Sequence, residues 1–242
     1  MNTAQVGFQC PECVSAAGQK VVTARSLGPT QPYLIMAIIA ANVAMFVAQQ
    51  GSQSFQNDLI LIGRTPIPGI GVDAGEWWRL LSGGFLHGDL LHLGFNMYLA
   101  WALGGALERS LGWIRLAVLY FGSLLAGSLG VMVVTAETPT LGASGAVFGL
   151  MGALAYLQQR SGQNPLTGGI GGLLLINLVL TFARPNISIG GHIGGLIGGV
   201  LLAALISTLD PEKPSRPGGG TIAAAFLGLG FGIAAIFLAG VG

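Results

Sequence analysis

The chain has 242 residues, and its composition is that of a membrane protein. Hydrophobic residues make up 52% of it and charged residues only 8%, against roughly 25% charged residues in a soluble domain. The 10 Lys and Arg and 9 Asp and Glu leave a net charge of +1, which provides no basic surface for phosphates, so no nucleic-acid partner is expected. The 41 glycines show no Gly-X-Y period, and closely packed membrane helices are commonly rich in glycine. We predict an all-α membrane protein.

Residues 1–31 are predicted to form a cytoplasmic N-terminal tail with a CxxC pair, Cys10 and Cys13, the two cysteines of the chain. Such a pair is half of a zinc ribbon, and a tetrahedral site needs two further ligands that the sequence does not place nearby. Zinc or redox use is one interpretation, and the remnant of a lost site is the other. No short apolar run with a cleavage site precedes the first apolar segment, so no signal peptide is expected.

Charged residues divide the rest of the chain into seven apolar segments. The uncharged runs that contain them have at least 18 residues, enough to cross a bilayer. We therefore predict a six-helix core in residues 32–209, and a linker with a seventh transmembrane helix in residues 210–242. The predicted helices are Tyr33–Ala48, Leu90–Leu107, Trp113–Thr135, Ser144–Gln159, Gly169–Ala183, Gly190–Leu209 and Thr221–Val241.

Basic residues are unequally divided between the two sets of helix ends. Lys and Arg favour the cytoplasmic side, so we expect a multi-pass protein of the cell membrane with a cytoplasmic N-terminus and an extracellular C-terminus. The second, fourth and sixth helices then begin at the outer face. The richer set is Lys20, Arg25, Arg109, Arg115, Arg160, Lys213 and Arg216, and the poorer set is Arg64, Arg79 and Arg184.

The connection from Gln49 to His87 is much longer than the others. Long loops on compact domains are usually functional or interfacial, and Trp77 and Trp78 suit the lipid headgroup layer. Two interpretations stay open for Trp78 and Arg79. They form an interfacial anchor, with Arg79 directed at lipid phosphates, or they contribute to a functional site.

Three histidines, His87, His92 and His192, lie at or inside the outer ends of the predicted helices. Ionisable side chains inside a membrane are costly to bury and therefore indicate function. His92 and Asn96 are four residues apart and share one helix face, whereas His87 points elsewhere. A polar contact that supports helix packing is the alternative for His92 and Asn96.

The fourth predicted helix begins at Ser144, which stands between glycines. Gly142 and Gly145 permit a tight turn and close backbone approach, and a helix N-terminus offers free N–H groups suited to an oxyanion. The alternative roles of Ser144 are a helix cap and tight packing.

The serine and two of the histidines are predicted to lie at the same depth in the membrane. Ser144 and His92 each lie 16 residues above the charged residue at the inner end of their helix, and His192 lies 18 above. At about 1.5 Å per residue these heights are roughly 24 to 27 Å, so one hydroxyl and two imidazoles share a level, with Asn96 one turn deeper. Serine and histidine at one level indicate nucleophilic acyl transfer by a dyad. No carboxylate lies in the same apolar runs, so something else must hold the imidazole.

Phe148 lies one helical turn after Ser144 and is either a stacking partner of the His192 ring or ordinary core packing. Glycine stripes on the fourth and sixth helices would let the two helices approach closely enough to join Ser144 and His192. His92, Asn96 and the Ser144 N–H would then surround the developing oxyanion. The stripes are Gly145, Gly149 and Gly152 on the fourth helix and Gly195 and Gly199 on the sixth.

Four motifs occur in order between about Pro32 and Leu209. They are Trp78-Arg79, His87-Gly88-Asp89-Leu90-Leu91-His92 with Asn96, Gly142-Ala143-Ser144-Gly145, and Gly191-His192-Ile193-Gly194-Gly195 with Gly199. As an ordered set they resemble the rhomboid intramembrane serine proteases. The resemblance implies a rhomboid-like helical bundle with a six-helix catalytic core and one extra C-terminal transmembrane helix.

The same resemblance implies Ser144 as nucleophile, His192 as general base, and His92 and Asn96 as oxyanion-hole groups. It implies no cofactor and no catalytic metal, and it implies single-pass transmembrane substrates that are cut near a small residue in the lipid bilayer. Phe148 stands where many members have Tyr. The segment from Val6 to Cys13 resembles the end of a zinc-ribbon extension of some bacterial relatives.

Three other functions are compatible with parts of the sequence. One is a catalytically inactive rhomboid-like protein that binds membrane clients, although such a role needs neither Ser144 nor His192. A second is a transporter or channel, but its polar groups would line a pore rather than share a level. A third is a three-histidine zinc hydrolase, for which no HExxH-like helix is present.

Overall fold

The structure of this protein is a computed structural model that describes residues 2–3, 8–9, 31–167, 169–184, 187–210 and 217–240. The chain divides into two compact units, Met1–Gln31 and Pro32–Gly242. In the first unit, β1 (Asn2–Thr3) pairs antiparallel with β2 (Phe8–Gln9). Cys10 and Cys13 lie outside the described residues, so the zinc and remnant interpretations remain predictions from sequence.

The described part of the second unit is a helical bundle with one principal helix for each predicted span, which confirms the predicted all-α fold. The second helix has two α-helical parts joined by a π-helical turn. Three short helices lie in the long first connection. In chain order the helices are α2 (Tyr33–Gly51), α3 (Gln53–Leu59), α4 (Arg79–Ser82), the 3-10 turn η1 (Gly83–Phe85), α5 (Leu90–Leu99), the π turn η2 (Ala100–Gly104), α6 (Gly105–Leu111), α7 (Trp113–Thr135), α8 (Ser144–Arg160), α9 (Ile170–Ala183), α10 (Ile189–Leu209) and α11 (Gly219–Gly240).

Five of these principal helices are long and apolar enough to cross a membrane. They are α2, the continuous segment α5–η2–α6, α7, α10 and α11. The other two are shorter, with 17 residues in α8 and 14 in α9. At about 1.5 Å per residue α8 is roughly 25 Å long, less than a hydrocarbon core of about 30 Å. Helix α8 is therefore too short to cross such a core by itself.

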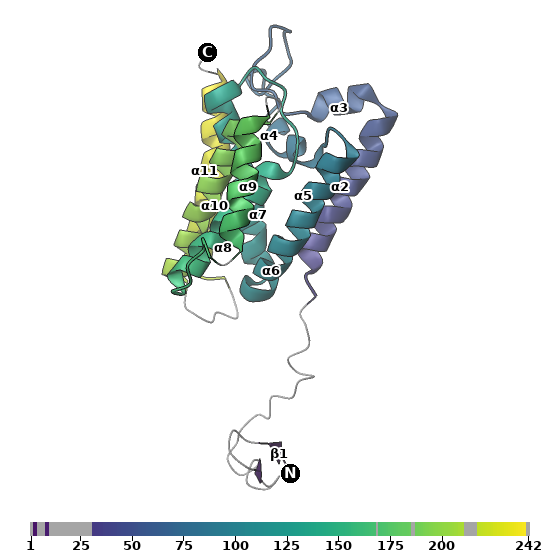
Figure 1. Cartoon of the computed structure of the whole chain (residues 1–242). Coiled ribbons are helices and arrows are strands. Elements are labelled where there is room, and N and C mark those ends of the chain that lie inside the picture. Colours follow the sequence, from purple (N-terminus) through teal and green to yellow (C-terminus); the bar gives the residue numbers. More distant parts are fainter. Residues whose placement is uncertain are drawn as a thin grey trace. The chain divides into compact units, whose positions relative to one another are not determined.

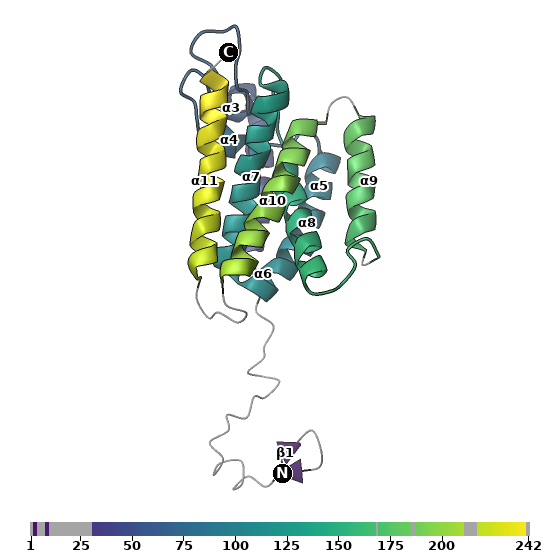
Figure 2. The same cartoon turned by 90° about the vertical axis from the view of Figure 1, so that its left-hand side faces the viewer.

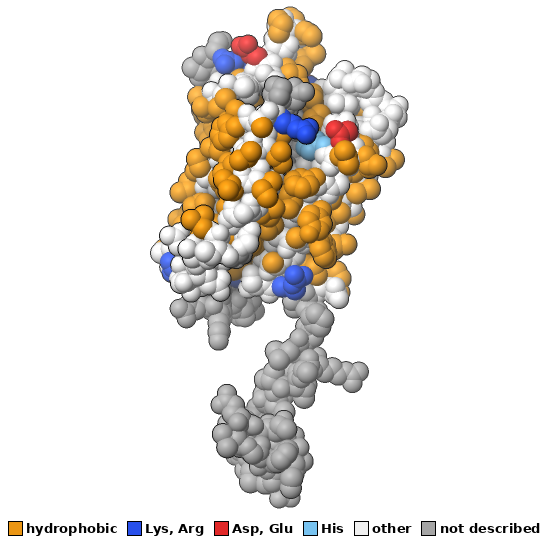
Figure 3. All heavy atoms as spheres, in the orientation of Figure 1, with side chains coloured by type: hydrophobic (Ala, Val, Ile, Leu, Met, Phe, Trp, Pro, Cys, Tyr) orange, Lys and Arg blue, Asp and Glu red, His pale blue; other side chains and the backbone are white. Residues whose placement is uncertain are grey.

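Helices α7 and α10 form the centre of the second unit (Figures 1 and 2). Helix α10 packs against α7, α8 and α11, and α7 also contacts α8 and α11. Helix α9 stands at the edge of the bundle, where it touches α8 and α10 (Figure 2). Figure 3 shows hydrophobic side chains over the middle of one face and charged side chains near its two ends. This distribution is that of a protein surrounded by lipid.

Glycines allow the central helices to touch through their backbones. A methyl group added at Gly195 would collide with the carbonyl of Gly145, and one at Gly199 would collide with the carbonyl of Gly149. A methyl at Gly127 on α7 would lie 2.9 Å from the carbonyl oxygen of Gly191. A side chain at Gly195 or Gly199 would push α8 away from α10, and one at Gly127 would push α7 away from α10.

At the opposite end of α10 from His192, Asp210 joins three helices. Its carboxylate pairs with Arg115 of α7 at 2.9 Å and accepts hydrogen bonds from the backbone N–H of Gly220 and the hydroxyl of Thr221 at the start of α11. The Asp210 side chain is only 4% exposed. Burial alone would raise the pKa of this carboxyl, but hydrogen bonds from Thr221 and Arg115 outweigh that effect and lower the pKa from 3.8 to about 2.

We expect Asp210→Asn to lower the unfolding midpoint Tm in detergent at neutral pH. Because the folded-state pKa is lowered, the carboxylate contributes its full stabilisation, about 2 kcal/mol, above the ordinary pKa. That contribution is lost as the pH falls from 3.8 through about 2. The difference in Tm between native protein and Asp210→Asn should shrink over this pH range. Glu137→Gln, which removes an exposed carboxylate, is the control, and a difference that stayed constant on acidification would refute the assignment.

Candidate active site

A short hydrogen bond joins the two residues that the sequence predicts as a dyad. The Ser144 hydroxyl oxygen lies 2.8 Å from Nε2 of His192. Ser144 is the first residue of α8, and His192 lies in the first turn of α10, where the hydroxyl of Ser188 caps the helix by accepting a hydrogen bond from Gly191 N–H. The 8% exposure of His192 and the half-buried state of Ser144 leave the pair partly accessible.

The backbone before Ser144 is shaped for a close approach. Gly142 has φ of +124°, a conformation that side-chain-bearing residues rarely adopt, and its N–H donates to the carbonyl of Gly83 at 2.9 Å. Ala143 occupies the N-cap of α8 and has no side-chain acceptor. The N–H groups of the first turn of α8 are therefore directed at the space in front of Ser144.

Aromatic stacking holds one face of the His192 ring. The rings of Phe148 and His192 are stacked, with centroids 4.1 Å apart and planes inclined by 20°. Phe148 is 2% exposed. Of the two interpretations from sequence, stacking describes the contact. The phenylalanine ring provides the flat apolar surface that such stacking needs.

A residue that the sequence did not single out contacts the other ring nitrogen. The hydroxyl of Thr181 on α9 lies 2.6 Å from Nδ1 of His192 and also donates to the carbonyl of Asn177 at 2.7 Å. Thr181 is 1% exposed. A lone threonine in an apolar helix commonly bonds its own backbone, so the sequence offered no signal that this hydroxyl would reach a histidine.

The predicted oxyanion pair lies beside Ser144. A methyl group added at Gly142 would lie 2.9 Å from Nε2 of His92 and 3.7 Å from the Ser144 hydroxyl oxygen, so the ring edge and the hydroxyl border the same small space. Nδ1 of His92 accepts from the N–H of Gly88 at 3.4 Å. That bond places the ring proton on Nε2, which faces this space. The backbone N–H of His92 donates to the carboxylate of Asp89, the N-cap of α5.

Asn96 lies one turn further along α5. Its amide nitrogen donates one hydrogen bond to the carbonyl of His92 at 2.9 Å, and the residue is 4% exposed. An amide has two hydrogens, so the second is available to a ligand. His92 and Asn96 therefore lie one turn apart on α5, as their spacing of four residues predicts.

Comparison with known proteins places the whole of this site within one family. A family model described as the Rhomboid domain matches residues 74–209. Rhomboid protease GluP of Bacillus subtilis (strain 168) is 35% identical over 168 residues, which are 68% of this chain and 32% of GluP. The putative rhomboid protease YdcA of the same bacterium is 36% identical over 142 residues, 55% of this chain and 70% of YdcA. RHOMBOID-like protein 4 of Arabidopsis thaliana is 34% identical over 152 residues, 51% of this chain and 38% of that protein.

The chain belongs to the rhomboid family. Together with its five candidate spanning helices, this membership makes it a multi-pass membrane protein. The matched segment of this rhomboid contains Ser144, His192, His92, Asn96 and Phe148, whereas α2 and α11 lie outside it. The aligned part spans about a third of the length of GluP.

His87 supports the loop that leads into α5 of this rhomboid. It is fully buried, and its backbone is held by Gln49 of α2, whose amide donates to the His87 carbonyl at 2.5 Å and accepts from its N–H at 3.0 Å. The His87 ring meets that of His92 edge-on, with centroids 5.0 Å apart. Burial, with a smaller effect of neighbouring His92, lowers the pKa of His87 from 6.5 to about 4. His87 therefore supports His92 as a neutral ring.

Of the two interpretations of Arg79, the one that directs it at lipid phosphates is wrong. Arg79 is 1% exposed. Its guanidinium pairs with Glu76 at 2.6 Å and donates to the carbonyls of Asn57 at 2.7 Å and Ile60 at 2.8 Å. Unpaired backbone carbonyls in a long loop are costly to bury, and one guanidinium satisfies two of them, which the sequence alone could not reveal.

Trp78 is 41% exposed, and its indole N–H donates to the carbonyl of Asp58 at 3.2 Å. Trp77 beside it is 58% exposed. These two side chains fit the interfacial interpretation, while Arg79 fits a structural role in the same loop.

A small cavity of about 30 Å³ opens beside Ser144. Its walls are mostly glycines and small side chains, including Gly127, Ser128, Gly145 and Ser188. A water molecule needs roughly 10 to 15 Å³ of such space, so the cavity has room for water.

Proposed function

We propose that this rhomboid is an intramembrane serine endopeptidase that hydrolyses peptide bonds in or near transmembrane segments through a Ser144–His192 dyad. The 2.8 Å hydrogen bond between the serine hydroxyl and Nε2 of the histidine carries the proposal. A neutral imidazole in that position is a general base for serine. The names of the curated relatives support the reaction class.

The reaction proceeds in two acyl-transfer steps. Nε2 of His192 takes the hydroxyl proton as the Ser144 oxygen attacks the peptide carbonyl, and the resulting imidazolium returns the proton to the leaving amine. A water molecule then attacks the acyl-enzyme, again losing its proton to His192, and releases the acid and free Ser144. The cavity beside Ser144 has room for water. The steps need no cofactor and no metal.

The oxyanion of each tetrahedral intermediate would be held by the Ser144 N–H, Nε2–H of His92 and the free amide hydrogen of Asn96. Donors placed in advance around a developing charge lower the barrier without reorganisation. In water-poor surroundings each such donor contributes more than it would in bulk water.

We expect Asn96→Ala to lower kcat about 100-fold with little change in KM, because an oxyanion donor acts mainly in the transition state. Asn42→Ala is a matched control. Asn42 is also a buried asparagine whose amide donates to the carbonyl four residues earlier, Ile38, at 2.8 Å, but it lies on α2. The control should lose stability and keep kcat within about twofold per folded molecule. Equal kcat losses in the two variants would show that Asn96 is not an oxyanion-hole donor.

Substrates are proposed to be single-pass membrane proteins cut beside a small residue. The dyad lies at the start of a helix of 17 residues, at a depth where a substrate must come through the bilayer. The cavity beside Ser144 has a volume of only about 30 Å³, which suits a small side chain at the cut.

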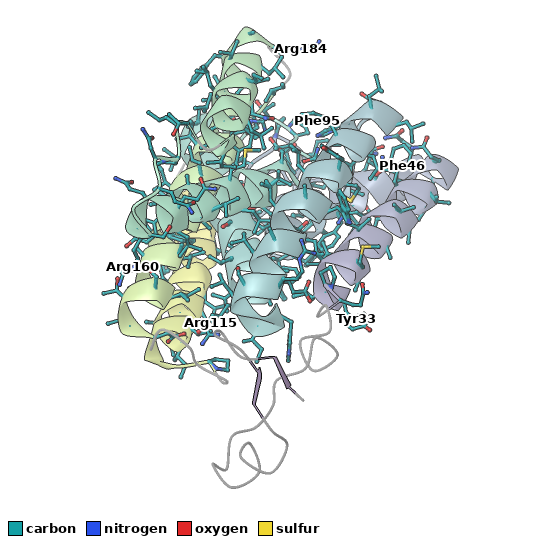
Figure 4. The ribbon with its side chains drawn as sticks, turned by 60° about the horizontal axis from the view of Figure 1, so that its bottom comes forward. Tyr33, Phe46, Phe95, Arg115, Arg160 and Arg184 are labelled. Carbon is teal, nitrogen blue, oxygen red and sulfur yellow. The ribbon has the colours of Figure 1, made fainter. Side chains whose placement is uncertain are left out.

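The proposed topology has the N-terminus in the cytoplasm and the C-terminus outside. Figure 4 places Arg115 and Arg160 at one end of the bundle and Arg184 at the other. Arg79 of the poorer set and Arg115 of the richer set are both buried, so the excess of basic residues in the richer set remains. The domain assignment is 1–31 as tail, 32–209 as protease core and 210–242 as linker and seventh helix.

The decisive experiment is cleavage of a tagged single-pass membrane protein in liposomes by native protein and by Ser144→Ala. Native protein should cut the substrate and react with a fluorophosphonate at Ser144, and the variant should do neither. If chelation abolished cleavage while the fluorophosphonate failed to label native protein, the dyad would be wrong. If native protein cut none of a panel of helices with small residues near their outer ends, a client-binding role would replace the proposed one.

A further inference from the structure

We infer that Thr181 is a positioning residue that sets the tautomer and orientation of His192, an inference that rests on the proposed function. Its hydroxyl oxygen lies 2.6 Å from Nδ1 of His192, and the same hydroxyl lies 2.7 Å from the carbonyl of Asn177. In this arrangement a neutral hydroxyl on α9 occupies the place that a carboxylate holds in a serine–histidine–aspartate triad.

The direction of the hydrogen bonds follows from counting protons. A threonine hydroxyl has one hydrogen and two lone pairs. A carbonyl only accepts, so the Thr181 hydrogen is donated to Asn177, and toward His192 the oxygen can only accept. Nδ1 must therefore carry the ring proton. Nε2 is then unprotonated and faces the Ser144 hydroxyl at 2.8 Å, as a general base requires.

The opposite tautomer would cost the dyad its base and Thr181 one of its two hydrogen bonds. A proton on Nε2 would prevent that atom from taking the serine proton. The Thr181 hydroxyl could then satisfy the bare Nδ1 only by turning its one hydrogen away from the carbonyl of Asn177. Losing a hydrogen bond at a buried polar group is costly. The hydroxyl thus selects the active tautomer before substrate arrives.

The same contact persists through the reaction. When His192 takes the serine proton, Nδ1–H remains directed at the Thr181 oxygen, and the new positive charge strengthens that bond. Thr181 also lies in the last turn of α9, which ends at Ala183, and the C-terminal end of a helix carries partial negative charge. Both effects favour the imidazolium.

Three helices together fix the ring. Helix α10 carries it, Phe148 of α8 stacks on its face, and Thr181 of α9 holds its outer edge. Because α9 stands at the edge of the bundle (Figure 2), the Thr181 bond is a link between this outer helix and the dyad.

The test compares Thr181→Val, which keeps the shape and removes the hydroxyl, with Thr181→Ser, which keeps the hydroxyl. We expect Thr181→Val to lower kcat at least about tenfold with KM nearly unchanged, since the loss of one hydrogen bond is worth about that factor, and Thr181→Ser to stay within about threefold. Thr221→Val is the control. It removes an equally buried threonine hydroxyl, bonded to Asp210, at the other end of the bundle, and should lower Tm while leaving kcat unchanged.

A spectroscopic measurement tests the inference without relying on turnover. The chain has three histidines, so ¹⁵N-histidine NMR of native protein, with the His192 signal assigned by its loss in His192→Gln, reports which ring nitrogen carries the proton. The expected result is Nδ1–H in native protein and a mixture of tautomers in Thr181→Val. A native His192 protonated on Nε2 would overturn the inference, even if the variants failed to fold.

The outcomes separate this inference from the proposed function. If native protein cuts and Ser144→Ala does not, but Thr181→Val retains native kcat, the positioning role fails and the protease stands. If native protein and Ser144→Ala behave alike toward every substrate, the proposed function fails, and the NMR result still decides the tautomer that Thr181 selects.

Discussion

Ser144→Ala and His192→Gln are each expected to reduce the cleavage rate by at least about 10⁴-fold, and the double variant to be no slower than the slower single variant. The two side chains share one proton across a 2.8 Å hydrogen bond. Removing either partner therefore disables the other, so the second substitution has nothing left to remove. The measurement is the rate in liposomes at equal folded amounts.

The control for this comparison of single and double variants is a pair of residues that act independently. Asn42 lies on α2 and bonds Ile38, whereas Asp210 directly follows α10 and bonds Thr221. The effects of Asn42→Ala and Asp210→Asn on Tm should therefore add. If the losses of rate from Ser144→Ala and His192→Gln multiplied in the double variant, the two residues would not form a catalytic unit.

Gly195→Ala is expected to lower the cleavage rate by about 100-fold or more, because a shift of about 1 Å between reacting groups has effects of that size. The added methyl would collide with the carbonyl of Gly145, the residue next to Ser144. Helices α8 and α10 must then separate, and this movement lengthens the hydrogen bond between Ser144 and His192. Overpacking of this kind also destabilises by about 1 to 3 kcal/mol, so Tm should fall as well.

Gly230→Ala is the matched control for the glycine prediction. Gly230 lies in α11, and a methyl group there would meet no atom within 4 Å. Rate and Tm should stay at their native values or, for Tm, rise slightly, since alanine is the better helix former. A native rate in Gly195→Ala, measured in folded protein, would mean that the helices tolerate separation and that the glycine contact does not position the dyad.

Much of the fold was predictable because membrane helices are long apolar segments, which the hydropathy of the sequence reveals directly. All seven predicted spans form helices in the described part of the chain, and α7 has the predicted bounds, Trp113–Thr135. The spacing of Ser144, Phe148, His92 and Asn96 follows from a helix of 3.6 residues per turn. The π-helical turn at Ala100–Gly104 was not predicted, since no local residue pattern separates it from an ordinary helix.

The residues that were misread or missed are those whose partners lie on a different segment of the folded chain. Arg79 binds carbonyls of Asn57 and Ile60, and its exposure could be judged only after the loop was folded. Thr181 of α9 reaches His192 of the next helix, α10. Neither contact has a period or a spacing that composition or helical geometry would reveal.

The sequence by itself determined the class of protein, the positions of its membrane helices and the level at which serine and histidine lie. These properties depend on local quantities, namely hydropathy, charge and the rise of a helix. Only the tertiary structure decided which helix faces meet, and therefore that Ser144 and His192 are in contact, that Phe148 stacks on the ring and that Thr181 holds its far edge. The glycine faces of α8 and α10 pack closely enough to bring Ser144 and His192 together, and no single helix contains that information.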